Sequence, residues 1–215
     1  MLKKLLRPIY FYFREKKELF LFQYLLKNKI KNKAPLKLVI GSSSIYQEGW
    51  LPTEAHFLNL LEQNDWLKYF EENTLTNIVA EHVWEHLTKE NGLIAMKTCF
   101  IFLKNNGGKL RIAVPDGFHP DKNYIDTVKP NGSGAGAHDH KLLYNYKLMS
   151  EMLVSVGFRV DLIEYFDENG TFHQNNWSGD DGHIRRSFTH DERNKNGKPN
   201  YTSLIIDAVK QSITN

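Results

Sequence analysis

Blocks of apolar and polar residues alternate between residues 77 and 116, in the centre of the chain. A short apolar run is followed by a polar cluster, by apolar residues at helical spacing, by a glycine pair and by a second apolar run. In chain order these blocks are Ile78–Ala80, then Glu81, His82, Glu85 and His86, then Leu93, Met96 and Ile101, then Gly107-Gly108, and finally Leu110–Val114. The pattern predicts a strand, a polar segment, a helix, a glycine turn and a second strand.

The polar cluster and the end of the second strand are expected to lie on the same edge of a sheet. Two parallel strands need a crossover of about this length. In open α/β sheets, ligands bind outside the carboxyl ends of the strands. Glu81 and His82 follow the first of the two strands, and Pro115-Asp116 ends the second. The sequence therefore predicts a site at this edge.

Further helices and strands are predicted on both sides of this unit. Strands are expected at Leu36–Ile40, Trp50–Thr53, Phe57–Leu60, Phe158–Phe166 and Thr202–Val209. Helices are expected after Pro8, with another start before it, at Trp66–Phe70 with Asp65 as the N-cap, and from about Asn145 to Val156, where Gly157 ends the helix. Residues 117–137 contain four glycines and two prolines. We expect this segment to have no regular element and to act as a lid over a site.

Two motifs of the central block together resemble one known family. They are Glu-His-x-x-Glu-His-Leu at residues 81–87 and Leu-Lys-x-x-Gly-Gly-x-Leu-Arg-Ile-Ala-Val-Pro-Asp at residues 103–116. They resemble the fourth and fifth strands of class I S-adenosylmethionine-dependent methyltransferases, and in particular small predicted methyltransferases often associated with surface-polysaccharide genes. The resemblance covers roughly residues 36–210. It implies an α/β, Rossmann-like class I methyltransferase sandwich with a mostly parallel central sheet, an antiparallel last strand and an added N-terminal helical arm.

The resemblance also implies which residues hold S-adenosyl-L-methionine. A glycine-rich loop follows the first strand in this family, and Gly41, Ser42 and Ser43 occupy that place here, with serines where the family has glycines. Glu54, after the second strand, is expected to bind the ribose hydroxyls. In this family an acidic residue after the third strand commonly contacts adenine, and Asn59 is the nearest match to that residue here. Glu81 and His82 would lie beside the methionine portion.

Methyl transfer to a hydroxyl requires a group that positions and deprotonates the acceptor. Histidine titrates near neutral pH and is suited to this role. We expect His138 or His140 to be the base, since they follow the fifth strand on the side where an acceptor would enter. His86 and Asp116 are further candidates. The expected acceptor, a saccharide or a similar small polar molecule, follows only from the resemblance.

Two other functions remain open. The chain could bind the cofactor without catalysis and recruit a partner, as the serines after the first strand and Asn59 depart from the family pattern. It could also be a metal hydrolase built on His138, His140, His173 and His183. The spacing of His82 and His86 is similar to that of a zinc helix, but Val83 stands where metalloproteases have Glu. We therefore expect no metal at that pair. Arg185 and Arg186 could bind a phosphate or carboxylate, or clamp their loop to Asp180, Asp181 or Asp191.

The first 33 residues differ in charge from the rest of the chain. They contain ten Lys/Arg and two Glu, whereas the remainder has 18 basic and 23 acidic residues. We expect residues 1–35 to form a basic amphipathic helical arm and residues 36–215 to form the methyltransferase-like domain. The arm could contact an anionic membrane surface, or pack on the domain or on a second subunit, which we favour. No nucleic-acid partner is expected, because no base-reading module accompanies the charge.

The length of 215 residues and the 41% hydrophobic content fit one globular α/β domain. The single cysteine, Cys99, excludes a disulfide framework. We expect a cytoplasmic protein, with peripheral contact to the inner face of the membrane if the arm binds lipid. The longest apolar run, residues 19–26, is too short to span a bilayer.

Overall fold

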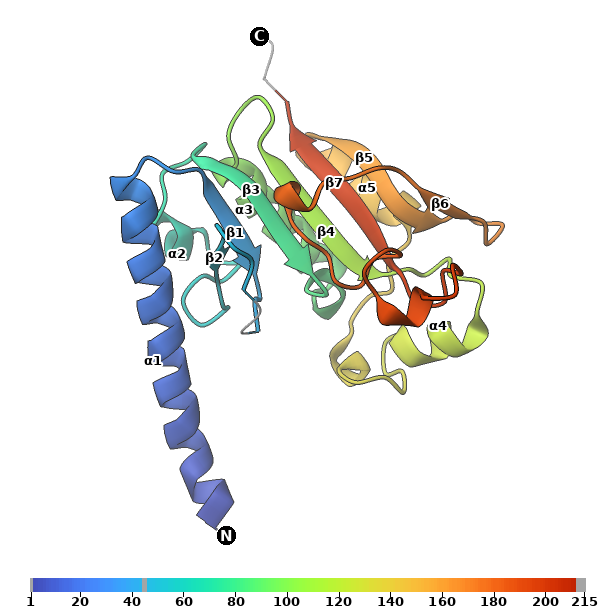
Figure 1. Cartoon of the computed structure of the whole chain (residues 1–215), viewed down its shortest axis with the longest axis horizontal. Helices are drawn as coiled ribbons and strands as arrows, with labels where there is room; N and C mark the ends of the chain where they lie inside the picture. Colours follow the sequence, from blue (N-terminus) through green and yellow to red (C-terminus); the bar gives the residue numbers. More distant parts are fainter. Residues whose placement is uncertain (1, 44–45, 212–215) are drawn as a thin grey trace.

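A seven-stranded mixed sheet runs through the molecule in the order β2-β1-β3-β4-β7-β5-β6 (Figure 1). The computed structural model describes residues 2–43 and 46–211. Its strands are β1 (Leu36–Ile40), β2 (Leu51–Pro52), β3 (Leu75–Glu81), β4 (Lys109–Pro115), β5 (Phe158–Phe166), β6 (Phe172–Gln174) and β7 (Ser203–Lys210). Strands β2, β1, β3 and β4 pair in parallel, and β7 lies antiparallel between β4 and β5. The predicted architecture, mostly parallel with an antiparallel last strand, is confirmed.

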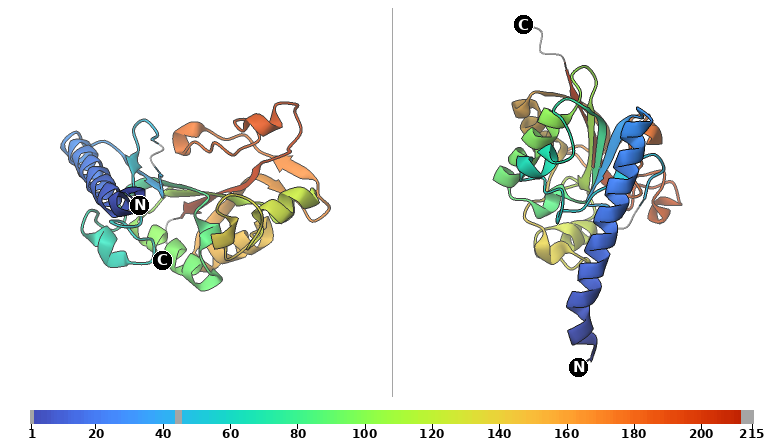
Figure 2. Two further views of the ribbon diagram at one scale, coloured as in Figure 1. Left: turned by 90° about the horizontal axis from the view of Figure 1, so that it is seen from below. Right: turned by 90° about the vertical axis from the view of Figure 1, so that its left-hand side faces the viewer.

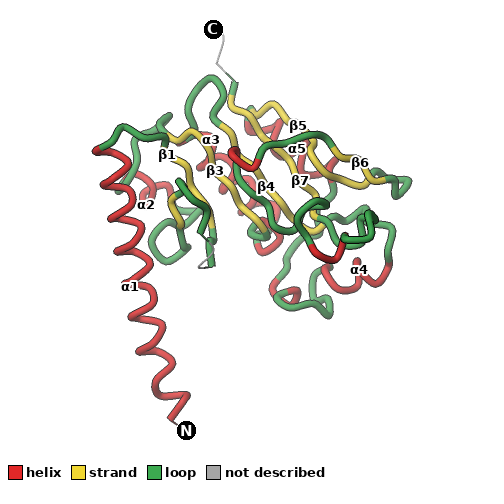
Figure 3. Tube along the Cα trace, viewed as in Figure 1, coloured by secondary structure: helices red, strands yellow, loops and turns green. Residues whose placement is uncertain are grey.

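The helices of the described residues are α1 (Leu2–Lys31), α2 (Gln63–Leu67), α3 (Lys89–Phe102), α4 (Lys122–Val128) and α5 (Tyr146–Val156) (Figure 3). Short 3-10 turns lie at Trp84–His86, Ala137–Asp139, Gly179–Asp181 and Glu192–Asn194. The side chain of Thr88 caps α3 by accepting a hydrogen bond from the backbone N–H of Asn91. Gly157 ends α5, as predicted, because its φ of 111° is easily adopted only by glycine.

The two faces of the sheet are covered in different ways. On one face, the side chains of Ile78, Ile112 and Ile206 join the large core that includes α3 and α5. Alternate residues point to the other face, where Val79, Ala113 and Ile205 pack against Ile184. Ile184 belongs to the long loop of residues 175–202, which crosses this face between β6 and β7 (Figure 2). A loop therefore covers a surface that helices cover in most doubly wound sheets.

Arg111 fastens the 175–202 loop to the sheet. Its guanidinium group donates two hydrogen bonds to the carboxylate of Asp207 and two more to the carbonyls of Ser178 and Gly182. Gly182 also allows close approach, since a Cβ there would lie 2.9 Å from Cβ of Val79. The loop is thus held by a buried charged group as well as by apolar packing.

The N-terminal helix α1 has two different halves. Its C-terminal half packs on the body of the molecule, where Phe22 is buried against Phe57 and Tyr69. Its N-terminal half projects away from the body (Figures 1 and 2), and Tyr10 and Phe13 are exposed there. None of the helices in the described part of the chain is long and apolar enough to cross a bilayer. The division of the chain into an arm and a domain at residue 35 stays a prediction.

The predicted strand at Phe57–Leu60 is wrong. The segment forms successive turns, because the backbone N–H groups of Phe57 and Leu58 both bond locally to the carbonyl of Glu54. The helix after it begins at Gln63, so that Glu62 stands at the N-cap position predicted for Asp65. Strand β2 is also shorter than predicted, and β7 begins and ends one residue later.

The segment between Asp116 and His138 is more regular than predicted. It contains the seven-residue helix α4, which the side chain of Asp121 caps by accepting from the N–H of Asn123. The glycines and prolines lie on both sides of this helix rather than inside it. The expectation of an irregular segment was wrong for this reason.

Candidate functional site

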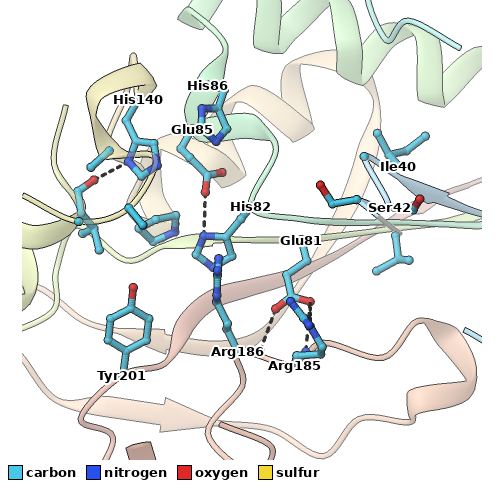
Figure 4. Close-up of a pocket in the computed structure, with 18 of the residues that line it drawn as sticks. Ile40, Ser42, Glu81, His82, Glu85, His86, His140, Arg185, Arg186 and Tyr201 are labelled. Atoms are coloured by element: carbon cyan, nitrogen blue, oxygen red, sulfur yellow. Dashed lines mark hydrogen bonds and ion pairs between the residues drawn. The ribbon is translucent and has the colours of Figure 1, made fainter. Parts of the chain in front are cut away.

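A cavity of about 460 Å³ lies at the carboxyl ends of β1, β3 and β4 (Figure 4). The chain leaves β1 for β2 on one side and returns to β3 on the other, which makes this edge the switch point of the sheet. The lining side chains come from the ends of these strands, from the segments that follow β1 and β3, from α4 and the segment after it, and from the 175–202 loop. Those that could contact a ligand through polar groups are Ser42, Ser43, Gln47, Glu81, His82, Glu85, His86, Thr127, His140, Arg185, Arg186, Arg193 and Tyr201.

The loop after β1 lines the cavity and is tied to the end of β2. The Ser42 hydroxyl and the Ser43 backbone N–H both donate to Oε1 of Glu54, each at 2.7 Å. Gly41 has a φ of 59°, and a Cβ there would lie 3.1 Å from the side chain of Val83. Gly41, Ser42 and Ser43 therefore border the cavity. Glu54 does not line it, but its hydrogen bonds hold this loop from outside.

Asn59 lies outside the cavity, in the turns before α2. Its side-chain oxygen accepts from the N–H of Leu61, and its carbonyl accepts from the indole N–H of Trp66. Because the predicted third strand does not form, Asn59 is not brought to the edge of the sheet. Its expected contact with adenine has no support in this geometry.

Glu81 joins the end of β3 to the 175–202 loop. Its carboxylate accepts from the backbone N–H groups of Arg185 at 3.2 Å and Arg186 at 2.8 Å. Both arginine side chains line the cavity. The predicted clamp to an aspartate does not describe them, since Asp181 pairs with Lys109 and Asp191 with Arg193.

His82 bridges three parts of the chain. Its Nδ1 lies 2.8 Å from Oε1 of the buried Glu85, and its Nε2 lies 3.0 Å from the hydroxyl of Ser203 on β7. Its backbone has a φ of 57°, which is strained for a residue with a side chain. The helical turn begins only at Trp84, so His82 and His86 do not share a helical face.

His86 contacts His140 instead, at the other end of the cavity. The two imidazole rings are 4.9 Å apart between centroids and nearly perpendicular. Nδ1 of His140 lies 2.6 Å from the carbonyl oxygen of Val128, which can only accept a hydrogen bond. A neutral His140 therefore carries its proton on Nδ1, and the lone pair on Nε2 is left available.

Two predicted catalytic residues lie elsewhere. His138 is exposed and does not line the cavity. Asp116 is fully buried, and its two carboxylate oxygens accept from the backbone N–H groups of Phe118 and Phe166. Burial raises the pKa of Asp116 to about 6, although these hydrogen bonds oppose the shift. Asp116 thus joins the ends of β4 and β5. Contrary to the expectation from the sequence, it does not border the cavity.

The four histidines of the expected metal hydrolase do not converge. His173 pairs with Asp167 in the β5–β6 hairpin and stacks on the ring of Tyr165. His183 packs against His190 in the 175–202 loop. Only His140 of that set lines the cavity.

Five polar lining residues had no role assigned from the sequence: Gln47, Glu85, Thr127, Arg193 and Tyr201. Glu85 stands between two histidines in the central motif, which was a usable signal. Arg193 and Tyr201 gave none, because their segment has no regular pattern and reaches the site only through the path of the 175–202 loop. The guanidinium carbon of Arg193 lies 3.3 Å from the ring centroid of Tyr201, so the two form a stacked pair at the cavity wall.

No protein-family model and no curated protein matches the chain. Among solved structures, it is similar to a SAM-dependent methyltransferase from Archaeoglobus fulgidus, with 14% identity, 93% of this chain and 98% of that chain covered, and a TM-score of 0.45. It is also similar to a SAM-dependent methyltransferase from Thermotoga maritima, with 11% identity, 95% of this chain and 96% of that chain covered, and a TM-score of 0.49. A complex of the Haloferax volcanii Trm112 methyltransferase activator with a methyltransferase is similar with 8% identity, 84% of each chain covered and a TM-score of 0.48. Likeness at this level carries no inference about activity, and the fold is assigned from the strand order itself.

Proposed function

We propose that this protein is a methyltransferase that transfers the methyl group of S-adenosyl-L-methionine to a hydroxyl of a small polar acceptor, such as a saccharide. The observation that carries the proposal is the cavity at the switch point of the sheet, with the loop of Gly41 to Ser43 on one side and histidines on the other. Its volume is within the range of small-molecule sites, about 300–1,000 Å³.

The end near β1 fits the cofactor. Small residues at positions 41–43 let a ligand approach the backbone, and the hydroxyl and amide groups there offer polar contacts. Arg185 and Arg186 supply cationic groups suited to the carboxylate of the methionine portion. When bound, the sulfonium supplies an activated methyl group. Glu54 then acts as a positioning residue, through its hydrogen bonds to Ser42 and Ser43.

The opposite end fits a polar acceptor. His140, His86 and Tyr201 line it, and His140 holds its Nδ1 proton on the carbonyl of Val128. Nε2 of His140 is therefore the atom best placed to activate an acceptor hydroxyl. This assignment keeps one of the two histidines expected from the sequence and leaves out His138.

Calorimetry with S-adenosylhomocysteine tests the cofactor site. We expect one site per chain in the wild type. Glu54→Ala should weaken binding by about 1–3 kcal/mol, because the loop loses the carboxylate that holds it. Glu62→Ala, at an exposed glutamate outside the cavity, is the control. A wild-type protein that does not bind the ligand would refute the proposal.

Transfer of labelled methyl groups to a panel of sugars and nucleotide sugars tests catalysis. A protein that binds the cofactor but methylates none of the panel would favour the alternative of a silent cofactor-binding protein, acting through a partner.

The variant Asn59→Ala tests whether Asn59 contacts the adenine of the cofactor. We expect its affinity to equal that of the wild type, since Asn59 lies outside the cavity.

A further inference from the structure

Three side chains of types that can ligate metal ions meet at the end of the cavity opposite residues 41–43. A carboxylate oxygen of Glu85 and one ring nitrogen each of His86 and His140 all lie within 4.8 Å of one another. No other group of three or more such side chains comes together in residues 2–43 and 46–211. Figure 4 shows the three around one end of the cavity. We infer that Glu85, His86 and His140 bind a divalent transition-metal ion.

Glu85 is the first reason. It is 1% exposed, and among residues 2–43 and 46–211 neither of its carboxylate oxygens has a hydrogen-bond partner. Nδ1 of His82 lies 2.8 Å from Oε1 and pairs with it, although without hydrogen-bond geometry. A buried carboxylate whose oxygens accept no hydrogen bond is unfavourable, and a metal ion is a further partner that such groups take in proteins. A bound cation would remove this unfavourable burial.

The surroundings of the two histidines are the second reason. Metal-binding histidines almost always donate their other ring N–H to a carbonyl or carboxylate, which fixes the ring and its tautomer. His140 has this arrangement with the carbonyl of Val128 at 2.6 Å. Nδ1 of His86 lies 3.3 Å from a carboxylate oxygen of Asp139, but it has no hydrogen-bond partner among residues 2–43 and 46–211. The ring of His140 is thus held from behind by a hydrogen bond, whereas Asp139 only lies beside the ring of His86.

The ligand set indicates the class of ion. Two imidazoles and one carboxylate suit Zn²⁺, Mn²⁺, Fe²⁺ or Co²⁺, whereas Ca²⁺ and Mg²⁺ prefer oxygen ligands. Ligands about 2.1 Å from a tetrahedral ion are about 3.4 Å apart. Small side-chain rotations would therefore have to bring the three ligand atoms closer together than the 4.8 Å limit within which they lie here. Three protein ligands leave a position open toward the cavity, which is typical of catalytic metal sites.

A metal at this place would explain how an acceptor hydroxyl is activated. A bound ion lowers the pKa of a coordinated hydroxyl or water, so that His140 would act through the ion. This last step rests on the proposed function. Binding of the ion itself does not, because it depends only on the three side chains.

Titration of chelator-treated, full-length protein with Zn²⁺ and Co²⁺ tests the inference. We expect one ion per chain. The visible absorption spectrum of bound Co²⁺ should be that of an ion with few ligands, close to tetrahedral. His140→Ala should weaken binding by about 100-fold or more, since even loss of an outer hydrogen-bond partner reduces metal affinity 10- to 100-fold. His138→Ala is the matched control, because this exposed histidine lies two residues away outside the cavity.

Glu85→Gln keeps the volume of the side chain and removes its charge, so it tests the carboxylate with less risk to folding. Circular dichroism would check the fold of each variant. The inference is overturned if the wild type binds no ion, if His138→Ala loses as much affinity as His140→Ala, or if folded Glu85→Gln binds as tightly as the wild type. Titration with S-adenosylhomocysteine without metal separates failure of this site from failure of the proposed function.

Discussion

Asp116 and Glu85 are both buried carboxylates at the same edge of the sheet, but their surroundings differ. Each oxygen of Asp116 accepts a backbone N–H, and the residue joins the ends of two strands. In the described residues the oxygens of Glu85 accept no hydrogen bond, although Nδ1 of His82 lies 2.8 Å from Oε1, and Glu85 lines the cavity. Hydrogen-bond partners, rather than burial or residue type, separate a structural carboxylate from one available to a ligand.

Asp116 should make the stability of the protein depend on pH. Its pKa is raised from 3.8 to about 6 in the folded protein, so the folded state favours the protonated form. Stability from this group is present below the unfolded pKa and is lost as the pH rises toward 6. We expect the stability of the wild type relative to Asp116→Asn to fall by about 2–3 kcal/mol between pH 4 and pH 7.

Urea unfolding of both proteins across this range measures the difference. Asp126→Asn, at an exposed aspartate on α4, is the control. A constant difference between the wild type and Asp116→Asn at all pH values would contradict the prediction.

At the scale of elements, α1 combines a core helix with a projecting one. Phe22 is fully buried, whereas Phe20, only two residues away, is 71% exposed. The helix is amphipathic where it touches the body, but its exposed surface still carries aromatic residues along with lysines. The structure therefore supports packing on the domain for the C-terminal half, and leaves membrane or subunit contact of the N-terminal half as a prediction.

The two phenylalanines give a matched test. Phe22→Ala should lower the free energy of unfolding by about 3–5 kcal/mol, because it leaves a cavity between α1, Phe57 and Tyr69. Phe20→Ala should change it by no more than about 0.5 kcal/mol. Chemical unfolding measures both. Equal effects of the two substitutions would mean that α1 does not pack as described.

At the scale of the whole molecule, the 175–202 loop forms both the cover of one sheet face and one wall of the cavity. It contributes Arg185, Arg186 and Tyr201 to that wall. Arg111 and Glu81 hold it from opposite ends of the neighbouring strands. The shape of the cavity therefore depends on a segment that has little regular secondary structure.

Loss of the Arg111 side chain should loosen this loop. Arg111→Met leaves Asp207 buried with fewer partners and should destabilise the protein by about 3–5 kcal/mol. We also expect faster cleavage of the 175–202 loop in limited proteolysis. Arg159→Met, at an exposed arginine of β5, is the control. Unchanged proteolysis in Arg111→Met would show that the other contacts, among them the hydrogen bonds of Glu81, hold the loop without Arg111.

Local sequence patterns determined most of the secondary structure. The strands Leu36–Ile40 and Phe158–Phe166 and the end of α5 at Gly157 were predicted with the observed bounds. These elements depend on nearby residues: apolar runs, glycine at a helix end and turn residues between them. The polar cluster after β3 was predicted for the same reason, since parallel strands place their carboxyl ends together.

Only the tertiary structure decided which polar residues share the cavity. The sequence predicted Asn59, Asp116 and His138 in the site, but none of them lines the cavity. Asn59 lies in local turns, Asp116 is buried and bonded to backbone N–H groups, and His138 is exposed. It could not bring Arg193 and Tyr201 there, because their position depends on a long loop held by the distant Arg111. Glu85 and His140 are 55 positions apart in the sequence, and no local pattern records that folding brings them together. Contacts between distant segments follow from packing of the whole chain, whereas helices and strands follow from their neighbours in sequence.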